Sequence, residues 1–154
     1  MINFFYGIIG KPLSHSLSPE LHNFWFKKYK VLGNYSLIEV ELHEIEGVIN
    51  KIRNNELQGI NVTIPYKQAV IPFLDLIVDE AKETLSVNTI SLNKEKKIVG
   101  SNTDVYGLEQ GFINKLNNQD LEQNKTLILG AGGVTSSVIY ALSKKGIKQI
   151  FISN

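Results

Sequence analysis

Short apolar runs rich in β-forming residues alternate along this chain with stretches that carry apolar side chains at helical spacing. Phe4–Ile9 and Gly59–Ile64 are typical of buried strands, because each is short, apolar and followed at once by glycine or proline. Between them, Ile45–Ile52 places isoleucine and valine side chains on one face of a helix. Strands that alternate with helices predict an α/β fold built on a mainly parallel sheet with flanking helices.

Two strands further along are expected to form a hairpin. Thr89–Leu92 and Ile98–Ser101 flank the charged turn Asn93–Lys97, so one strand of the sheet should run antiparallel to its neighbours. Ser18–Glu20 predicts a helix start, with a hydroxyl N-cap, a proline at the first helical position and an acid in the first turn. The other expected strands are Tyr35–Val40, Thr126–Leu129 and Gln149–Ser153, and the other expected helical segments are Lys67–Phe73, Asp79–Leu85, Asp104–Leu116 and Thr135–Lys145.

A polar, amide-rich segment, Asn117–Asn124, is the predicted linker between two domains. Residues 1–117 form the first expected domain. Residues 118–154 hold a strand, a glycine-rich turn, a helix and a further strand, which predicts the start of a Rossmann-type β-α-β unit. A sheet of two strands cannot bury both faces, so this second unit is expected to be incomplete and either mobile, packed on the first domain or paired with another copy.

Composition and charge exclude several classes of function. The 154 residues carry a formal net charge of +1 and cluster their basic side chains only at Lys94–Lys97, which argues against nucleic-acid binding. The absence of cysteine excludes disulfides, thiolate metal sites and cysteine nucleophiles. His15, His22 and His43 lack zinc-ligand spacing with acidic partners, so we expect no metal. With no apolar run long enough for a membrane and no signal peptide, a cytoplasmic protein is expected.

Two loops carry candidate binding residues. Ser14–Ser18 offers three hydroxyls beside a helix N-terminus, where free N–H groups and the helix dipole favour a carboxylate or a phosphate. The alternative is that Ser18 only caps the helix. Asn61–Lys67 puts polar side chains at the C-terminal end of a strand, where α/β proteins place ligands. Lys67 is expected at a helix start, where a cation is unfavourable, and this conflict indicates a functional demand on the lysine, with a plain surface lysine as the alternative.

Three later segments have the same character. Ser86–Thr89 and Gly100–Asp104 each put an amide or a carboxylate at a strand end, although Asp104 could equally serve as a helix cap. Gly130–Gly133 follows a strand and opens a helix, the setting in which a glycine-rich turn lets a pyrophosphate approach backbone N–H groups. It is not a P-loop, because no Gly-Lys-Ser/Thr follows, and many such turns bind nothing.

In order and spacing, these segments resemble those of shikimate dehydrogenases. The similarity runs over nearly the whole chain, through Gly10–Pro19 with His22 and Asn23, Asn61–Lys67, Val87–Thr89, Gly100–Asp104 and Gly130–Gly133. The resemblance implies an NADP-dependent oxidoreductase, which reduces 3-dehydroshikimate to shikimate reversibly with NADPH in the biosynthesis of chorismate and the aromatic amino acids. It implies a small-molecule substrate, no metal, and no membrane or nucleic-acid partner, while assembly as a homodimer stays open.

The resemblance also implies roles for individual residues. Lys67 and Asp104 would be the catalytic pair, with Lys67 as the acid and base. The substrate-binding side chains would be Ser16, Ser18 and Thr63 at the carboxylate of shikimate, and Lys67, Asn88 and Asp104 at its ring hydroxyls. The cofactor-binding residues would be Gly130, Ala131, Gly132, Gly133 and Val134 at the diphosphate, Asn154 at the following strand end, and Asp79 near the nicotinamide.

The chain departs from the family pattern in two places. Val134 and Thr135 replace the small residues usual after the glycines. The chain ends at Asn154, where the family has an Asn-Arg-Thr segment whose arginine meets the 2′-phosphate of NADP, so we expect the 154-residue chain itself to be an incomplete, inactive or weakly active form. Two alternatives stay open: a quinate/shikimate dehydrogenase that uses NAD, and a non-catalytic shikimate-binding fragment. A generic α/β binding domain would need every one of these matches to be accidental.

Overall fold

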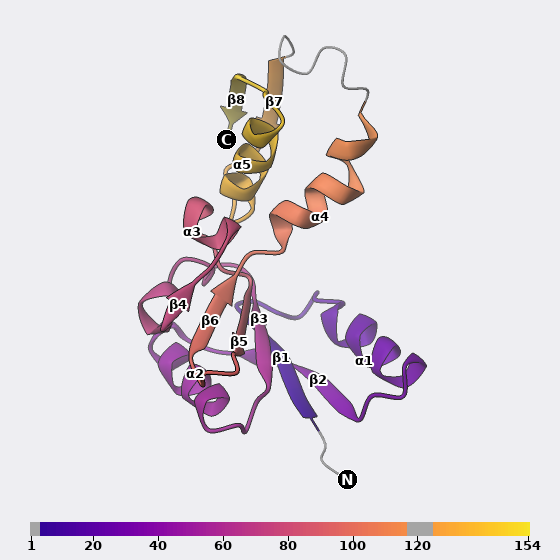
Figure 1. Cartoon of the computed structure of the whole chain (residues 1–154), viewed down its shortest axis with the longest axis vertical. Coiled ribbons are helices and arrows are strands. Elements are labelled where there is room, and N and C mark those ends of the chain that lie inside the picture. The colour runs from indigo at the N-terminus through magenta and orange to yellow at the C-terminus, as the bar shows by residue number, and fades with distance from the viewer. Residues whose placement is uncertain (1–3, 117–124) are drawn as a thin grey trace.

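The computed structural model describes residues 4–116 and 125–154 (Figure 1). The strands of its larger sheet are Phe4–Gly10 (β1), Gly33–Glu39 (β2), Gly59–Val62 (β3), Leu76–Ile77 (β4), Thr89–Leu92 (β5) and Ile98–Ser101 (β6). Their order is β2-β1-β3-β5-β6-β4. Within this sheet β5 pairs antiparallel with both of its neighbours, whereas the other pairs are parallel. The expected mainly parallel sheet with one antiparallel hairpin strand is therefore confirmed.

The part of the chain that the structure describes contains five α-helices. They are Ser18–Lys28 (α1), Ile45–Arg53 (α2), Glu80–Thr84 (α3), Asp104–Gly111 (α4) and Thr135–Lys144 (α5). Short 3-10 helices occur at Leu42–Glu44, Ile71–Phe73 and Ile113–Lys115. α1 contacts β2, and α2 contacts β5 and β6. Across residues 4–116 and 125–154, no helix has the length and apolar character needed to cross a membrane.

Residues 125–154 form a separate β-α-β unit. Lys125–Leu129 (β7) and Gln149–Ser153 (β8) pair in parallel as a two-stranded sheet, and α5 connects them. The strand-helix-strand start of a Rossmann-type unit is thereby confirmed. The predicted linker, residues 117–124, and with it the predicted boundary at residue 117, lies outside the described residues.

α5 packs against α4, so the β-α-β unit lies on the preceding part of the chain (Figure 1). Lys144, at the end of α5, makes ion pairs with Glu109 of α4 at 3.1 Å and with Glu80 of α3 at 3.4 Å. The hydrogen bond to Glu109 is the main cause that raises the pKa of Lys144. In this structure the second unit packs on α3 and α4, which is one of the three arrangements expected for it. The buried apolar residues of this contact are Val105, Ile113, Ala141, Leu142 and Ile147.

The backbone around Lys67 differs from the expected helix. Lys67–Phe73 is a turn that ends in the 3-10 helix Ile71–Phe73. Pro72 has no N–H group, so it cannot donate to the carbonyl of Gln68 as an α-helix would require. Lys67 therefore does not begin an α-helix, and the expected conflict with a helix dipole does not arise.

The starts and ends of other elements also differ from expectation. α1 begins at Ser18 itself, after Leu17 and without a side-chain cap, so the prediction that Ser18 is the N-cap was wrong. α4 ends at Gly111, before the expected end at Leu116, and the chain continues as the 3-10 helix Ile113–Lys115. The two-residue strand β4 is too short to leave a periodic signal, and the sequence did not predict it.

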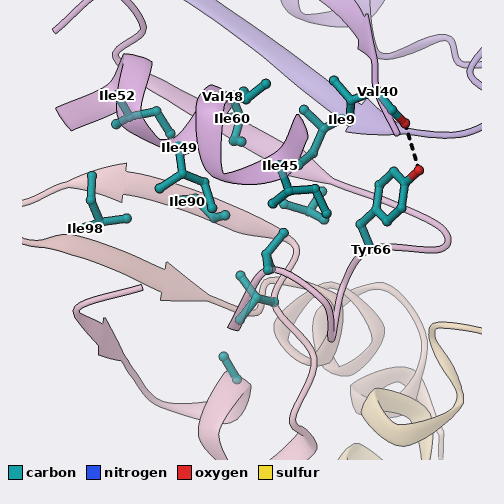
Figure 2. Packing of buried hydrophobic residues seen from close by; sticks show 14 residues of the cluster. Ile9, Val40, Ile45, Val48, Ile49, Ile52, Ile60, Tyr66, Ile90 and Ile98 are labelled. Carbon is teal, nitrogen blue, oxygen red and sulfur yellow. Dashed lines mark hydrogen bonds between the residues drawn. The ribbon is translucent and has the colours of Figure 1, made fainter. Parts of the chain in front are cut away.

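The core between α2 and the sheet explains why Ile45–Ile52 forms a helix there (Figure 2). Its apolar side chains are buried on one face, as 3.6 residues per turn predicts. Tyr66, beyond β3, donates a hydrogen bond from its hydroxyl to the carbonyl of Val40 at 2.7 Å, which anchors the Asn61–Lys67 loop to this core. The strand residues that Figure 2 labels in this cluster are Ile9, Ile60, Ile90 and Ile98.

Asp75, before β4, fastens α2 to the edge of the sheet. Its carboxylate accepts two hydrogen bonds from the guanidinium of Arg53, at 2.9 and 3.2 Å, and one from the N–H of Ile98 at 2.7 Å. The hydrogen bonds from Arg53, followed by that from Ile98, hold the pKa of Asp75 below its ordinary value of 3.8. The carboxylate therefore favours the folded state only while it is ionised.

Replacing Ile49 with alanine should destabilise the fold. Ile49 is 1% exposed, so Ile49→Ala removes buried methyl groups and leaves a cavity, which should lower the free energy of unfolding by about 2–5 kcal/mol. Asn50→Ala, at an exposed position of the same helix, is the matched control and should change that free energy by less than about 0.5 kcal/mol. Urea unfolding measures both, and equal stabilities of the two variants would contradict this core.

Replacing Asp75 with asparagine should destabilise the protein in a pH-dependent way. Because the folded-state pKa is lowered, the contribution of the carboxylate is present above its ordinary pKa of 3.8 and is lost as the pH falls through the lowered value. Asp75→Asn should therefore lower the melting temperature at about pH 6, and the gap to the parent should shrink toward about pH 2. A gap that stays constant as acid is added would be evidence against this role.

Candidate active site

The carboxyl ends of β1 and β3 bring two loops together at one end of the sheet. Gly10 ends β1, and a Cβ atom on it would lie 2.5 Å from Cγ2 of Thr63 and 2.9 Å from the carbonyl oxygen of Ile64. Only a residue without a side chain fits there. The N–H of Thr63 donates to the carbonyl of Ile9 at 2.9 Å, which holds the loop after β3 beside the loop after β1.

These two loops line a hollow of about 390 Å³. Ser16, Ser18 and Thr63, the three residues expected to bind a carboxylate, all line it, together with Lys11 and His15. The hydroxyl of Ser16 accepts a hydrogen bond from the N–H of Ser18 at 3.4 Å, so its own proton can still be donated to a ligand. The ammonium group of Lys11 is paired with the carboxylate of Glu41, so the donors that the hollow offers to a carboxylate are the hydroxyls.

Lys67, Asp104 and Asn88 form a hydrogen-bonded chain. Nζ of Lys67 lies 2.6 Å from Oδ2 of Asp104, and Nδ2 of Asn88 donates to the other carboxylate oxygen at 2.8 Å. The side chain of Lys67 is 13% exposed and that of Asp104 is 24% exposed, so the pair is largely shielded yet reachable. An ammonium group held in this way can give a proton to an oxygen atom that enters beside it, and can take the proton back.

Asn88 is itself held on several sides. Its Oδ1 accepts hydrogen bonds from the N–H of Thr103 at 3.0 Å and the hydroxyl of Thr89 at 2.9 Å, and its backbone carbonyl accepts one from Asn61 at 3.2 Å. Asn61 in turn accepts a hydrogen bond from the hydroxyl of Tyr35 at 2.7 Å. Burial raises the pKa of Tyr35, so this hydroxyl keeps the proton that it donates. These contacts fix the orientation of the Asn88 amide.

His22 packs against two aromatic rings. Its ring stacks on that of Tyr35 with 4.1 Å between centroids and meets Trp25 edge-on at 5.6 Å. Burial lowers the pKa of His22, which favours the neutral ring. Among the residues that the structure describes, no group of three or more histidine, aspartate or glutamate side chains is arranged to hold a metal ion.

A second hollow, of about 410 Å³, lies between the loop after β3 and the glycine-rich turn. Lys67 lines it together with Ala131–Gly133, Ser86 and Ser136. Ile64 lines this hollow as well as the one beside the serines. Lys67 therefore lies beside the glycine-rich turn, three residues after Ile64, which borders both hollows.

The backbone of the turn fits a bound diphosphate. Gly130 has a φ of 101°, a conformation that favours glycine. A Cβ atom on Gly132 would meet nothing within 4 Å, so the backbone there is open to a ligand. A Cβ atom on Gly133 would lie 3.3 Å from Cγ1 of Ile64, so the turn comes close to the loop that carries Lys67. The start of α5 directly after the turn favours a negative charge.

Four residues expected at the cofactor lie outside the lining of this hollow, and they are Gly130, Val134, Asn154 and Asp79. Val134 is 47% exposed beside the turn. The N–H of Gly130 donates to the carbonyl of Ser153 at 2.6 Å, so Asn154 follows β8 at the end that adjoins the turn. Asp79 precedes α3 with a φ of 49°, in the left-handed region.

Sequence reasoning missed the roles of three buried polar residues around the turn. Ser86 lines the hollow at 1% exposure, and its Oγ atom has no hydrogen-bond partner within the described residues. Asn102 and Ser137, at 5% and 1% exposure, are hydrogen-bonded to each other at 2.8 Å. Ser137 was a usable signal, because it lies one helical turn before Tyr140 and Ala141, on a face that would carry apolar residues if it only packed.

Residues 8–90, more than half of the chain, match the family model of the shikimate dehydrogenase substrate binding domain. The chain belongs to the shikimate dehydrogenase family. Of the residues described above, the hydroxyls of the first hollow, Lys67 and Asn88 lie inside the match, whereas Asp104 and the glycine-rich turn lie beyond it.

Curated members of the family are similar over nearly the whole chain. The shikimate dehydrogenase (NADP(+)) of Pelagibacter ubique (strain HTCC1062) is 46% identical over 147 residues, which cover 96% of this chain and 54% of that protein. The shikimate dehydrogenase (NADP(+)) of Clostridium beijerinckii is 47% identical over 150 residues, which cover 96% of this chain and 54% of that protein. The chain thus spans about half the length of the curated relatives it matches.

Solved structures of shikimate dehydrogenases share the fold. Shikimate dehydrogenase 1 from Peptoclostridium difficile has a TM-score of 0.86 at 34% identity, and the match covers 99% of this chain and 55% of that one. Shikimate 5-dehydrogenase from Thermus thermophilus, solved in complex with shikimate, has a TM-score of 0.85 at 28% identity, covering 98% and 57%. The similarity therefore includes the β-α-β unit as well as the six-stranded sheet.

Replacing Gly10 with alanine should disturb the end of the sheet. The new Cβ atom would collide with Thr63 and Ile64, so Gly10→Ala should lower the free energy of unfolding by about 1–3 kcal/mol. Gly47→Ala in α2 is the matched control, because a Cβ atom there meets nothing within 4 Å and should stabilise the helix by about 0.5–1 kcal/mol. Urea unfolding compares the two variants, and a Gly10→Ala protein as stable as the control would refute the close approach.

Proposed function

We propose that the intact protein that carries this chain is an NADP-dependent shikimate dehydrogenase. It catalyses the reversible, NADPH-dependent reduction of 3-dehydroshikimate to shikimate in the biosynthesis of chorismate and the aromatic amino acids. The observation that carries the proposal is the Lys67–Asp104 pair, with 2.6 Å between Nζ and Oδ2, beside a hollow lined by hydroxyls and a hollow lined by a glycine-rich turn. Relatives named as NADP-dependent shikimate dehydrogenases support it.

The first hollow binds the carboxylate of the substrate in this proposal. Ser16, Ser18 and Thr63 donate hydrogen bonds from their hydroxyls to the two carboxylate oxygens. Neutral donors suit a ligand that must be released after each turnover. Asn88 and Asp104 hold the ring hydroxyls, with the Asn88 amide as a donor and the Asp104 carboxylate as an acceptor.

Lys67 transfers the proton. As the ketone of 3-dehydroshikimate is reduced, negative charge develops on its oxygen, and an ammonium group beside that oxygen stabilises the charge and donates a proton to it. In the opposite direction the neutral amine accepts the proton of the alcohol. Asp104 accepts a hydrogen bond from the ammonium at 2.6 Å and so keeps it in one orientation through both steps.

The glycine-rich turn holds the cofactor. The open backbone of Ala131–Gly133 and the hydroxyl of Ser136 suit the diphosphate of NADP, and Gly130, Val134, Asn154 and Asp79 complete the proposed binding set. When bound, NADPH supplies the hydride. A shikimate dehydrogenase solved in complex with NADP+ has a TM-score of 0.84 over 99% of this chain, which supports a nucleotide at this turn.

The proposal assigns residues 1–117 to the substrate-binding domain and residues 118–154 to the start of the NADP-binding domain. Assembly as a homodimer and a cytoplasmic location belong to the same proposal and rest on the family. Light scattering of the purified protein tests the first, and cell fractionation tests the second.

NAD is the second candidate cofactor. A shikimate 5-dehydrogenase from Listeria monocytogenes, 30% identical with a TM-score of 0.83, was solved in complex with shikimate and NAD. Comparing kcat/KM for shikimate oxidation with NADP+ and with NAD+ distinguishes the two cofactors. Binding of shikimate without turnover by either cofactor would instead favour a non-catalytic binding protein.

Replacing Lys67 with alanine should remove most of the activity. Lys67→Ala in the intact protein should lower kcat by about two to four powers of ten, the usual contribution of a general acid or base. KM for shikimate should change much less, because the hydroxyls of the first hollow remain. Lys51→Ala, on the exposed face of α2, is the control and should behave like the parent. Near-normal kcat for Lys67→Ala would exclude the lysine as the acid and base.

Replacing Ser16 and Ser18 with alanine should weaken binding of the carboxylate. The double variant should lose about 1–3 kcal/mol of shikimate binding energy, the cost of lost hydrogen bonds to a charged group. A shikimate analogue without the carboxylate should bind the variant and the parent equally. Calorimetry measures both ligands, and equal losses for the two would show that the serines act on the fold instead.

A further inference from the structure

Asn102 lies where three parts of the proposed active site meet. It stands between β6 and α4, two residues before Asp104, and is 5% exposed. Its Nδ2 donates hydrogen bonds to Oγ of Ser137 and to the carbonyl of Ser86, both at 2.8 Å. Its Oδ1 accepts a hydrogen bond from the N–H of Asp104, also at 2.8 Å. One buried side chain thereby joins α5, the segment before Asn88 and the acidic partner of Lys67.

On one side, Asn102 fixes the backbone at the start of α4. Thr103, which precedes the helix, provides no side-chain cap. Asn102 supplies this function, because its Oδ1 also accepts a hydrogen bond from the N–H of Val105 at 3.4 Å. Lys67 and Asn88 hold the carboxylate of Asp104, and Asn102 holds its main chain.

On the other side, Asn102 holds the helix that follows the glycine-rich turn. Ser137 is in the first turn of α5, directly after Gly130–Gly133, and is 1% exposed. The apolar contact between α4 and α5 limits how far apart the two helices lie, but apolar packing has little directional preference. The ion pairs of Lys144 hold the far end of α5. The hydrogen bond from Asn102 to Ser137 is directional and acts in the first turn of α5, beside the glycine-rich turn, so it sets the position of that turn.

We infer that Asn102, with Ser137 as its partner, is a positioning residue that sets the glycine-rich turn relative to the Lys67–Asp104 pair. The inference rests on the proposed function, in which the nucleotide is held at the turn and Lys67 transfers the proton. Both act on one carbonyl group of the substrate, so a displacement of about 1 Å can cost about a hundredfold in rate.

Kinetics of Ser137→Ala in the intact protein test the inference. The variant leaves Asn102 in place and removes only its partner on α5, so kcat should fall about tenfold or more while KM for shikimate changes less than about twofold. Ser143→Ala, at the exposed end of α5, is the matched control with parental values. In a protein that already carries Asn102→Ala, adding Ser137→Ala should lower kcat no further, because the effects of two residues that act through one contact are not additive. Normal kcat in Ser137→Ala would overturn the inference.

Hydrogen exchange provides a readout that needs neither cofactor nor turnover. Ser137→Ala should speed exchange of the Asp104 N–H about threefold or more, because the Asn102 side chain that accepts its hydrogen bond loses a partner. A change confined to α5 would overturn the link. A parent protein that does not reduce 3-dehydroshikimate would overturn the proposed function. Hydrogen exchange at the Asp104 N–H would then still decide whether Asn102 couples α5 to the start of α4.

Discussion

The ion pair between Lys67 and Asp104 is the contact on which the rest of the site depends. Two charged groups that are largely shielded from water need each other and further hydrogen bonds, because either one alone would be costly to bury. Asn88 supplies a hydrogen bond to the second carboxylate oxygen, and Asn102 holds the main chain of Asp104. The pair therefore requires that three separate segments of the chain meet in one geometry.

The sheet topology brings those segments together. Lys67 follows β3, Asn88 precedes β5, and Asp104 follows β6. β5 lies between β3 and β6 and runs antiparallel to both, so its amino end adjoins the carboxyl ends of its neighbours. The antiparallel strand thus lets the amide of Asn88 reach the carboxylate oxygen of Asp104 that Lys67 does not contact. A wholly parallel sheet would have placed Asn88 at the far end.

The elements with a long, regular pattern could be predicted from the sequence. α2 shows its apolar face at helical spacing, and the β5–β6 hairpin shows its charged turn. The candidate site residues could be placed at strand ends, because α/β proteins bind ligands there. The family resemblance then supplied roles for Ser16, Ser18, Thr63 and Lys67 that residue types alone leave open.

Other features depend on contacts that no local pattern encodes. The sequence could not indicate whether Ser18 would precede α1 or begin it, since both choices leave a hydroxyl near the helix start. The hydrogen bond between Asn102 and Ser137 joins residues 35 positions apart. Asn102 also belongs to the Gly100–Asp104 segment, which the family resemblance had already explained as a substrate-binding motif, so nothing indicated a second contact. The turn that replaces the expected helix at Lys67–Phe73 is the exception, because Pro72, which lacks an N–H group, was a local signal against an α-helix there.

A crystal structure of the intact protein with shikimate and NADP+ is the most direct test of the proposed site. The carboxylate of shikimate should lie against the hydroxyls of Ser16, Ser18 and Thr63, a ring hydroxyl should lie within hydrogen-bonding distance of Nζ of Lys67, and the diphosphate should lie on the Gly130–Gly133 turn. Shikimate bound away from Lys67, or a nucleotide bound away from the turn, would contradict the assignment of Lys67 as the residue at which substrate and cofactor meet.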